Sequence, residues 1–241
     1  MAKSTKNRVG KVGRRGIVAP KSSSAAPVVS PPVPRPSSRS LVLVVSGPGG
    51  AGKTTLCEKL SAMSGGRLAL SISCTTRAPR GSEVDGRHYF FVSREEFERG
   101  IAAGNFAEHA EVAGNYYGTP RPFIEQQLAA GHDVLLDIDV QGGDSVRRMY
   151  GARVVSVFVL PPSRRILEER LRGRGTDSAE RVRARMELAE REIVRAGDYD
   201  YLVINGRQEE AIAEIDAIRR AEHARLTREG SGAAWALKTW S

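Results

Sequence analysis

Short apolar runs alternate with amphipathic stretches along most of the 241-residue chain. Apolar runs bounded by turn residues predict buried strands, and they occur at 41–46, 68–73, 133–137, 153–160 and 201–204. Apolar positions three and four apart predict helices at 53–63, 122–130, 143–149, 163–171, 179–195 and 208–225. This alternation predicts an α/β fold in which helices cover both faces of a parallel sheet. Residues 75–121 fit neither pattern and are predicted to be an irregular polar insert.

Charge is distributed unevenly between the first 40 residues and the rest of the chain. Residues 1–40 hold nine Lys or Arg and no Asp or Glu, so they account for the whole formal net charge of +9. Their Pro/Ser-rich composition predicts a disordered basic tail. An organelle transit peptide is the alternative, and loose contact with polyanions is a secondary role. The remaining residues are balanced in charge, which predicts no specific nucleic-acid site there. Residues 226–241 are predicted to be a loose tail with two tryptophans that could dock on the body.

Cysteine content and hydropathy bear on location. Cys57 and Cys74 have neither zinc nor redox spacing, which predicts reduced thiols. No apolar stretch approaches the roughly 18 residues that a membrane-spanning helix needs. We therefore expect a cytoplasmic protein without membrane contact.

The segment SGPGGAGKTT lies between the first predicted strand and the first predicted helix. From Gly47 to Thr54 it fits G-x-x-x-x-G-K-[ST], in which glycines let backbone N–H groups converge on an anion at a helix N-terminus. Lys53 is expected to reach the β and γ phosphates, and the Thr54 hydroxyl to bind Mg²⁺. A glycine-rich turn with an incidental lysine is the alternative, which the flanking strand and helix disfavour. The residues expected to bind ATP phosphates are Gly47, Pro48, Gly49, Gly50, Ala51, Gly52, Lys53, Thr54 and Thr55.

A second polar element, DVLLDIDVQG, ends a buried strand with Asp137 and Asp139. Carboxylates at the carboxyl end of a parallel strand lie where such sheets bind ligands. Asp137 is placed to hold Mg²⁺ directly or through water, and Asp139 to meet a substrate. Alternatively, the pair caps the next helix N-terminus at Gly142.

The insert carries candidate ligands for a phosphoryl acceptor. Arg77 and Arg80 make a fork suited to a phosphate dianion, and Tyr89 and Tyr117 can add phenolic donors. The alternative for these arginines is that they are solvated surface charges.

Five segments, SGPGGAGKTT, TTRAPRGSEVDGRHYFF, GNYYGTP, DIDVQG and RLRGRGTD, together resemble the guanylate kinase family from about residue 41 to 225. The resemblance implies transfer of the ATP γ-phosphoryl group to GMP with Mg²⁺, and a P-loop NTPase-type core with a mobile acceptor domain and a lid. We expect a core at 41–74, 122–171 and 191–225, a GMP-binding subdomain at 75–121 and a lid at 172–190. The expected substrates are ATP with GMP or dGMP.

The same resemblance implies a set of residue roles. Ser73 would contact the base, while Arg77, Arg80, Tyr89 and Tyr117 would hold the GMP phosphate. Glu108 resembles the acid that reads guanine, and a carboxylate can accept from the adjacent N1–H and N2–H₂ donors that adenine lacks. Thr119 and Ser73 would donate to O6, and Asp139 would accept from N2–H₂. Lys53 would act with the lid arginines on the triphosphate, and Asn205 would lie on the adenine side. The lid arginines are Arg170, Arg174 and Arg185.

A few positions depart from the family pattern, and two other functions stay open. Cys74 and Thr119 replace serines, and Gly50 stands where serine is frequent. Cys74 has a thiol where the family's serine would offer a second hydroxyl near the base. The alternatives are a non-catalytic guanylate-kinase-like binding module, which usually lacks a working P-loop, and a kinase for a sugar phosphate, which would lack the base-reading acids.

Overall fold

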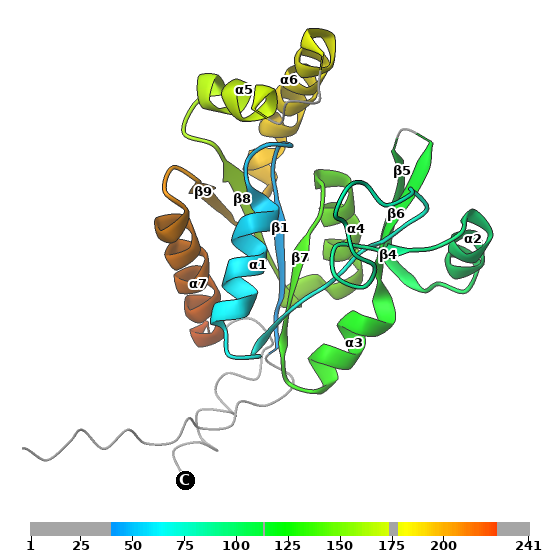
Figure 1. Cartoon of the computed structure of the whole chain (residues 1–241). Helices are drawn as coiled ribbons and strands as arrows, with labels where there is room; N and C mark the ends of the chain where they lie inside the picture. Colours follow the sequence, from blue (N-terminus) through cyan, green and yellow to red (C-terminus); the bar gives the residue numbers. More distant parts are fainter. Residues whose placement is uncertain (1–39, 113, 174–177, 226–241) are drawn as a thin grey trace, which may run out of the picture. The chain divides into compact units, whose positions relative to one another are not determined.

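The computed structural model describes residues 40–112, 114–173 and 178–225 (Figure 1). Apart from Ser40, the two predicted tails lie outside these ranges, as does Arg174. None of the helices within the described ranges is both long enough and apolar enough to cross a membrane.

A parallel sheet in the order β2-β7-β1-β8-β9 forms the centre of the described chain (Figure 1). The first strand by sequence, β1, lies between β7 and β8, so the loop after β1 emerges in the middle of the sheet edge. The predicted α/β class is therefore confirmed. The strands are β1 (Val42–Ser46), β2 (Leu68–Leu70), β7 (Asp133–Asp137), β8 (Val154–Leu160) and β9 (Tyr201–Ile204).

Helices cover both faces of this sheet because side chains alternate along its strands. Leu43 and Val45 of β1 pack with residues of α1 and α7, whereas Val42 and Val44 pack with residues of α3 and α4. Helices α5 and α6 pack on each other through a separate apolar cluster that includes Leu171. The helices are α1 (Lys53–Met63), α3 (Arg121–Ala129), α4 (Val140–Tyr150), α5 (Arg164–Arg172), α6 (Ala179–Val194) and α7 (Gln208–Ala224), with short 3₁₀ turns at Gly151–Arg153 and Arg195–Asp198.

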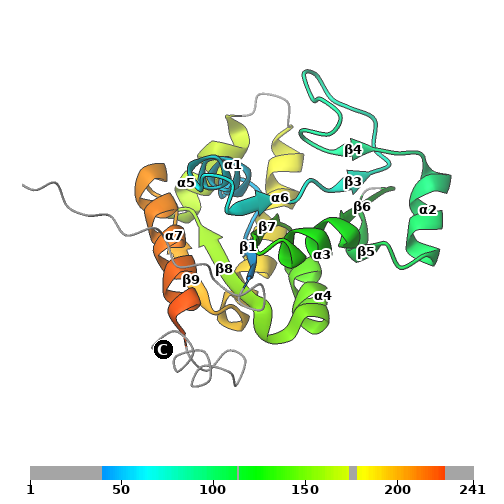
Figure 2. The same cartoon turned by 90° about the horizontal axis from the view of Figure 1, so that it is seen from below.

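The insert is not irregular, so this prediction was wrong. It forms a helix and a second sheet in the order β4-β3-β6-β5, whose strands are labelled in Figure 2. Phe97, at 1% exposure, stacks on Phe106 and Tyr116 at centroid distances of 4.3 and 5.2 Å. Two of the strands are only two residues long, too short for a periodic signal. The elements are β3 (Cys74–Thr75), β4 (Phe90–Phe91), α2 (Arg94–Ala102), β5 (Phe106–Val112) and β6 (Asn115–Pro120).

Most predicted element bounds agree with the structure, and two that differ have a local cause. The predicted strand 68–73 ends at Leu70, and Cys74 and Thr75 pair instead in the second sheet. The helix predicted at 143–149 begins at Val140, because Asp139 accepts a hydrogen bond from the Gly142 N–H at 2.8 Å and caps the helix.

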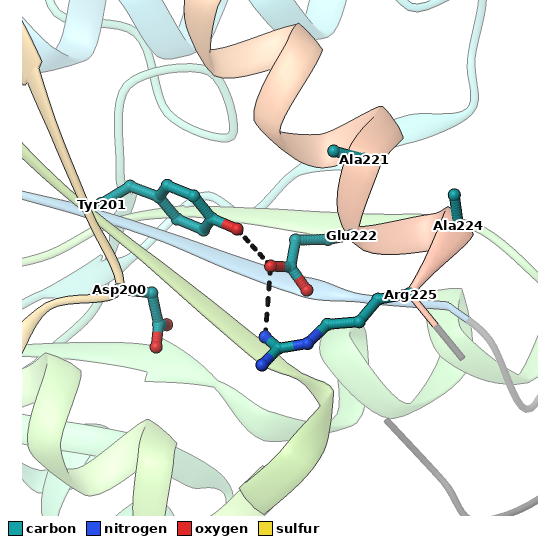
Figure 3. A pocket seen from close by; sticks show the side chains of 6 residues that line it. All are labelled: Asp200, Tyr201, Ala221, Glu222, Ala224 and Arg225. Atoms are coloured by element: carbon teal, nitrogen blue, oxygen red, sulfur yellow. Dashed lines mark hydrogen bonds and ion pairs between the residues drawn. The ribbon is translucent and has the colours of Figure 1, made fainter. Parts of the chain in front are cut away.

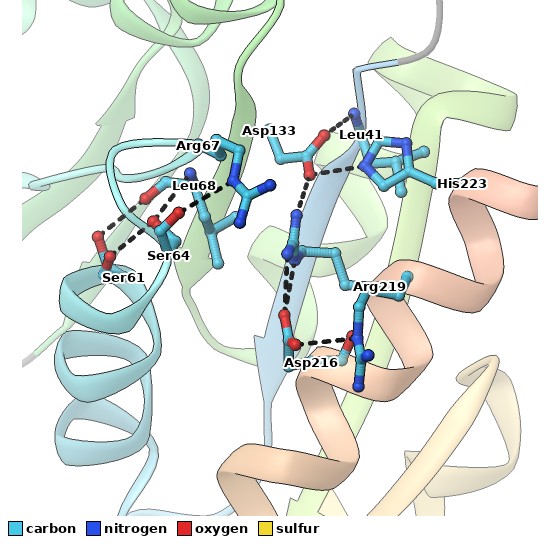
Figure 4. A network of polar contacts seen from close by, with 10 residues as sticks. Leu41, Ser61, Ser64, Arg67, Leu68, Asp133, Asp216, Arg219 and His223 are labelled. Carbon is cyan, nitrogen blue, oxygen red and sulfur yellow. Dashed lines mark hydrogen bonds and ion pairs between the residues drawn. The ribbon is translucent and has the colours of Figure 1, made fainter. Parts of the chain in front are cut away.

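A buried ionic network fixes the start of β7 to α7 (Figure 4). Asp133 accepts hydrogen bonds from the Leu41 N–H at 3.0 Å and from Arg219 at 2.8 Å, and its carboxylate lies 2.7 Å from His223 Nε2. Burial would raise the pKa of Asp133, but the bonds from His223, Leu41 and Arg219 outweigh it and lower that pKa. Asp216 binds the same Arg219 at 2.9 Å. The network thus joins three elements at the end of the sheet where the strands begin.

Asp133→Asn should lower the free energy of unfolding at pH 7 by about 3 kcal/mol, the low end for a broken buried ion pair, because the buried Arg219 charge then keeps only the partly exposed Asp216 carboxylate. Because the Asp133 pKa is lowered in the native state, its contribution exists above the ordinary aspartate pKa of about 3.9 and is lost as the pH falls below it. Urea unfolding at several pH values measures both effects. Glu125→Gln, on an exposed ion pair with Arg121, is the control and should change stability little. Equal stability of the two variants would contradict the assignment.

Candidate active site

The loop between β1 and α1 depends on glycines with positive φ. Gly47, Gly50 and Gly52 have φ of 141°, 96° and 90°. A Cβ on Gly47 would lie 2.2 Å from the Val159 carbonyl oxygen, and one on Gly52 would lie 2.5 Å from Asn205 Nδ2. The loop therefore packs against β8 and the end of β9 with no room for side chains at these two glycines.

Lys53 and Thr54 follow this loop at the start of α1. Lys53 Nζ donates to the carbonyl oxygens of Gly47 at 2.6 Å and Pro48 at 3.3 Å, so the ammonium lies over the loop. The Thr54 hydroxyl donates to Asp137 Oδ2 at 2.6 Å. The structure thus brings together the two oxygen ligands that the sequence predicts for Mg²⁺. Thr55 is exposed beside them.

The Ala51 carbonyl is held by two side chains from distant elements. Asn205 Nδ2 donates to it at 2.7 Å and Arg170 at 3.4 Å, and Arg170 also donates to the Asn205 carbonyl at 3.0 Å. Asn205 is 2% exposed. Sequence reasoning missed this support of the loop. The adenine-side role of Asn205 stays a prediction.

Three of the four predicted phosphate ligands in the insert lie together. Arg77 is 9% exposed, its Nε donates to the Tyr117 hydroxyl at 3.2 Å, and its guanidinium lies 5.5 Å from the centroid of the Tyr89 ring. The two tyrosine rings meet edge to face at 5.9 Å. The side chain of Arg80 is exposed.

Glu83 connects the two arginines and was missed by sequence reasoning. Its carboxylate accepts from Arg77 at 3.0 Å and from the Arg80 backbone N–H at 2.8 Å. Desolvation opposes its charge, but the hydrogen bonds from Arg80 and Arg77 outweigh this and lower the pKa of Glu83. An acid three residues after Arg80 in a Gly-containing turn was the available signal. Glu83 therefore holds the Arg77 guanidinium in place before any anion binds.

Antiparallel pairing of β5 with β6 sets Glu108 directly opposite Thr119. The Thr119 hydroxyl donates to Glu108 Oε1 at 2.5 Å. The carboxylate also lies against α4, since a Cβ on Gly142 would come within 3.0 Å of Glu108 Oε2. Burial raises the pKa of Glu108 to about 7; the Thr119 hydrogen bond lowers it in part and the Asp139 charge raises it. Three of the predicted base-reading residues are therefore neighbours.

The carboxylates at the end of β7 have different partners. Asp139 caps α4 at Gly142, as one reading of the sequence expected, whereas Asp137 binds Thr54 instead. Asp139 is exposed, and it is the charged group that raises the pKa of Glu108.

Ser73 and Arg185 are two further predicted site residues. Ser73 is partly buried just before β3, and its carbonyl accepts from the Phe90 N–H at 2.9 Å. Arg185 is partly buried on α6. The predicted contacts of both with substrates stay predictions.

A pocket of about 660 Å³ lies elsewhere, beside the start of β9 and the end of α7 (Figure 3). Its buried acid, Glu222, accepts hydrogen bonds from the Tyr201 hydroxyl and from Arg225. Asp200 at its rim accepts from Ser156. These contacts join α7 to β9 and join β8 to Asp200, the residue before β9. The pocket contains no predicted site residue. Its lining residues are Asp200, Tyr201, Ala221, Glu222, Ala224 and Arg225.

The fold and the site define an α/β protein of the P-loop NTPase type. The glycine-rich loop follows the central strand, its lysine and threonine begin the next helix, and an acid ends the neighbouring strand. The insert that forms the second sheet adds a separate group of polar side chains, among them Arg77 and Glu108.

Comparison with known proteins identifies the family. The family model described as Guanylate kinase matches residues 39–222. The chain is 49% identical to the guanylate kinase of Symbiobacterium thermophilum, with 80% of this chain and 90% of that protein covered. It is 48% identical to that of Salmonella typhimurium, with 77% and 90% covered. The crystal structure of guanylate kinase from Anaplasma phagocytophilum is similar, with a TM-score of 0.65, 39% identity and coverage of 78% of this chain and 89% of that one. The chain belongs to the guanylate kinase family.

Gly47→Ala should disrupt the loop, because the added methyl group would overlap the Val159 carbonyl and φ would be strained. We expect a loss of at least about 2 kcal/mol in the free energy of unfolding, measured by urea titration. Gly49→Ala is the matched control, since a Cβ there has no heavy atom within 4 Å. If both variants unfold at the same urea concentration, the loop is not constrained as described.

Proposed function

We propose that this protein transfers the γ-phosphoryl group of ATP to GMP, giving ADP and GDP. One observation carries the proposal. The Glu108–Thr119 pair lies against α4 close to its cap, Asp139. Two residues before this cap, Asp137 accepts a hydrogen bond from Thr54 of the phosphate loop. A base-reading acid and a phosphate loop therefore meet at one end of one sheet.

The same observation weighs against the two alternatives. A non-catalytic binding module has no need of Lys53, Thr54 and Asp137 in this arrangement. A sugar-phosphate kinase has no use for an acid such as Glu108, whose two oxygens match the adjacent donors of guanine.

Guanine recognition follows from the chemistry of Glu108. Its carboxylate can accept from N1–H and N2–H₂, while adenine would present a lone pair at N1 and leave buried acceptors unpaired. Thr119 donates to Glu108 in the structure and so orients the carboxylate. Its predicted donation to O6 requires that this bond be given up, whereas Ser73 could donate without such a change. Asp139 would accept the remaining N2 hydrogen.

Phosphoryl transfer needs positioning and positive charge more than covalent chemistry. Arg77, already fixed by Glu83 and Tyr117, would bind the GMP phosphate with Arg80 and Tyr89. Lys53 would leave the carbonyls of Gly47 and Pro48 for the triphosphate. Arginines that reach the γ-phosphate would also exclude water, the competing acceptor; the candidates are Arg170, Arg174 and Arg185.

The Thr54–Asp137 pair fits a magnesium ion. Mg²⁺ prefers oxygen ligands and keeps several waters, so one or two side chains and the phosphates suffice. Within the described ranges, no three His, Cys, Asp or Glu side chains are grouped to hold a metal by themselves, which agrees with this shared mode. Bound there, Mg²⁺ would neutralise the β- and γ-phosphate oxygens.

Different segments of the chain would bind ATP, bind GMP and close over the triphosphate. Residues 41–74, 122–171 and 191–225 would form the ATP-binding core, 75–121 the GMP-binding subdomain and 172–190 the lid. The second sheet occupies most of the 75–121 range, and β6 ends at Pro120 where the core helix α3 begins.

A coupled ADP-release assay with GMP, AMP, UMP and ribose phosphates tests the proposed function. The wild type should use GMP at least about 10³-fold better than AMP in kcat/KM, because AMP leaves the Glu108 acceptors unpaired. Lys53→Ala should cut kcat about 10²-fold or more while the protein stays folded. Equal use of GMP and AMP would mean that Glu108 does not read the base, and near-normal turnover of Lys53→Ala would remove the P-loop from the mechanism.

GMP affinity should depend on pH through Glu108. The carboxylate accepts from guanine only when ionised, and burial raises its pKa to about 7. GMP should therefore bind about tenfold more weakly at pH 6 than at pH 8 from this group alone. Calorimetric titration of GMP at both pH values measures the ratio.

Glu108→Gln is the control for this titration, because the GMP phosphate also titrates near pH 6. The variant should bind GMP more weakly at both pH values and lose the part of the ratio that comes from Glu108. An identical ratio in wild type and variant would assign the whole pH dependence to the phosphate.

A further inference from the structure

Two consecutive glycines, Gly142 and Gly143, lie in the first turn of α4, and both are buried. Glycine in a helix is less favourable than alanine, because it loses more backbone entropy on folding. Neither residue is among the glycines with positive φ, so the backbone conformation does not require glycine at these positions. The absence of a side chain is therefore the property that these two positions use.

The two glycines make room for different side chains. A Cβ on Gly142 would lie 3.0 Å from Glu108 Oε2, 3.1 Å from its Cδ and 3.2 Å from its Cγ. A Cβ on Gly143 would lie 3.0 Å from the Tyr199 hydroxyl oxygen, and its three nearest heavy atoms include none of Glu108. Gly142 therefore lies along the side chain of a predicted base-reading acid, whereas Gly143 accommodates a tyrosine.

Glu108 is also held from the side of the second sheet. Thr119 of β6 donates to Glu108 Oε1 at 2.5 Å, and the pairing of β5 with β6 sets the two residues opposite each other. The preceding residue, Ala107, is 4% exposed and belongs to the apolar cluster that contains Val146 of α4. One carboxylate oxygen of Glu108 is thus fixed by Thr119, while the other lies against Gly142. A methyl group at Gly142 would have to displace this carboxylate from its hydrogen bond.

Gly142 also orients the second predicted base-reading acid. Its backbone N–H donates to Asp139 Oδ1 at 2.8 Å, so one residue contacts both acids. Fixed acceptors discriminate strongly against a base that lacks the matching donors, because the acceptors are then left unpaired. Guanine has the N1–H and N2–H₂ donors, whereas hypoxanthine, the base of IMP, has N1–H but no amine. The spacing of the two acids therefore bears on the choice between these bases.

We propose that Gly142 determines base specificity by setting the positions of Glu108 and Asp139, the first through its missing side chain and the second through its backbone N–H. This inference rests on the proposed function, because guanine is the base whose donors match the two acids. Alanine at this position keeps the N–H and therefore the Asp139 cap, so it changes the packing against Glu108 alone. Since it acts through these acids, Gly142 is a positioning residue.

Calorimetric titration of Gly142→Ala with GMP, IMP and ADP tests the inference in the full-length protein. The Kd of GMP should rise about tenfold, close to the loss of one hydrogen bond to a charged group. The Kd of IMP should rise less, because IMP makes fewer of the displaced bonds, so the preference for GMP over IMP should shrink at least about threefold. The Kd of ADP should stay unchanged, because the substitution leaves the phosphate loop intact.

Gly143→Ala is the matched control, because its methyl group would be equally close to Tyr199 and not to Glu108. It should leave the ratio of the GMP and IMP affinities unchanged. Glu108→Ala removes the atoms that Gly142 lies against, so Gly142→Ala should weaken GMP binding no further in that background. Additive losses in the double variant would overturn the inference.

A wild-type GMP/IMP ratio in Gly142→Ala, or the same loss in Gly143→Ala, would also overturn it. If Gly142→Ala unfolds at a lower urea concentration, Glu108→Ala should restore its stability by removing the contact, and failure to do so would contradict the inference. Wild-type protein that binds neither GMP nor IMP would contradict the proposed function together with this inference. Normal GMP turnover in the wild type with an unaltered Gly142→Ala variant would contradict the inference alone.

Discussion

The parallel pairing of β1 with β7 sets Val45 opposite Asp137, and this register fixes the distance between the loop after β1 and the acid that ends β7. The same register sends Leu43 and Val45 toward α1 and α7. A slip of one residue would exchange the two faces of β1 and move Asp137 away from Thr54. Apolar packing of the central strand therefore decides whether the polar site can form.

Strand β7 carries an acid at each end, one with a role in stability and one at the candidate active site. Asp133 at its start is surrounded by donors and stabilises the fold. Asp137 at its end has one hydroxyl partner, and Glu108, whose pKa is raised by burial, lies against α4, the helix that follows β7. Carboxylates with few donors around them can accept hydrogen bonds from a ligand that carries donors.

The sequence predicted the parts of the fold that have a long apolar period, such as α1 and β7, and the phosphate loop, which has a strict spacing. It did not predict the second sheet, because two of its strands have two residues each, β5 mixes Glu and His with apolar residues, and β6 contains Gly and Pro. The bonds of Asn205 were missed because they join residues far apart in the chain, whereas Glu83 was missed although its partners, Arg77 and Arg80, are close to it in the sequence. Asp139 was ambiguous because an acid before a helix can cap it and still face a ligand.

The Ala51 carbonyl oxygen, which accepts from both Asn205 and Arg170, joins the loop to α5 and to the end of β9. Any rotation of α5 changes the donor geometry at that one oxygen. Occupancy of the phosphate loop and the orientation of α5 are therefore thermodynamically linked, and the linkage is reciprocal: a nucleotide that favours one orientation is itself bound more tightly in that orientation. Such coupling needs no contact between the nucleotide and the helix.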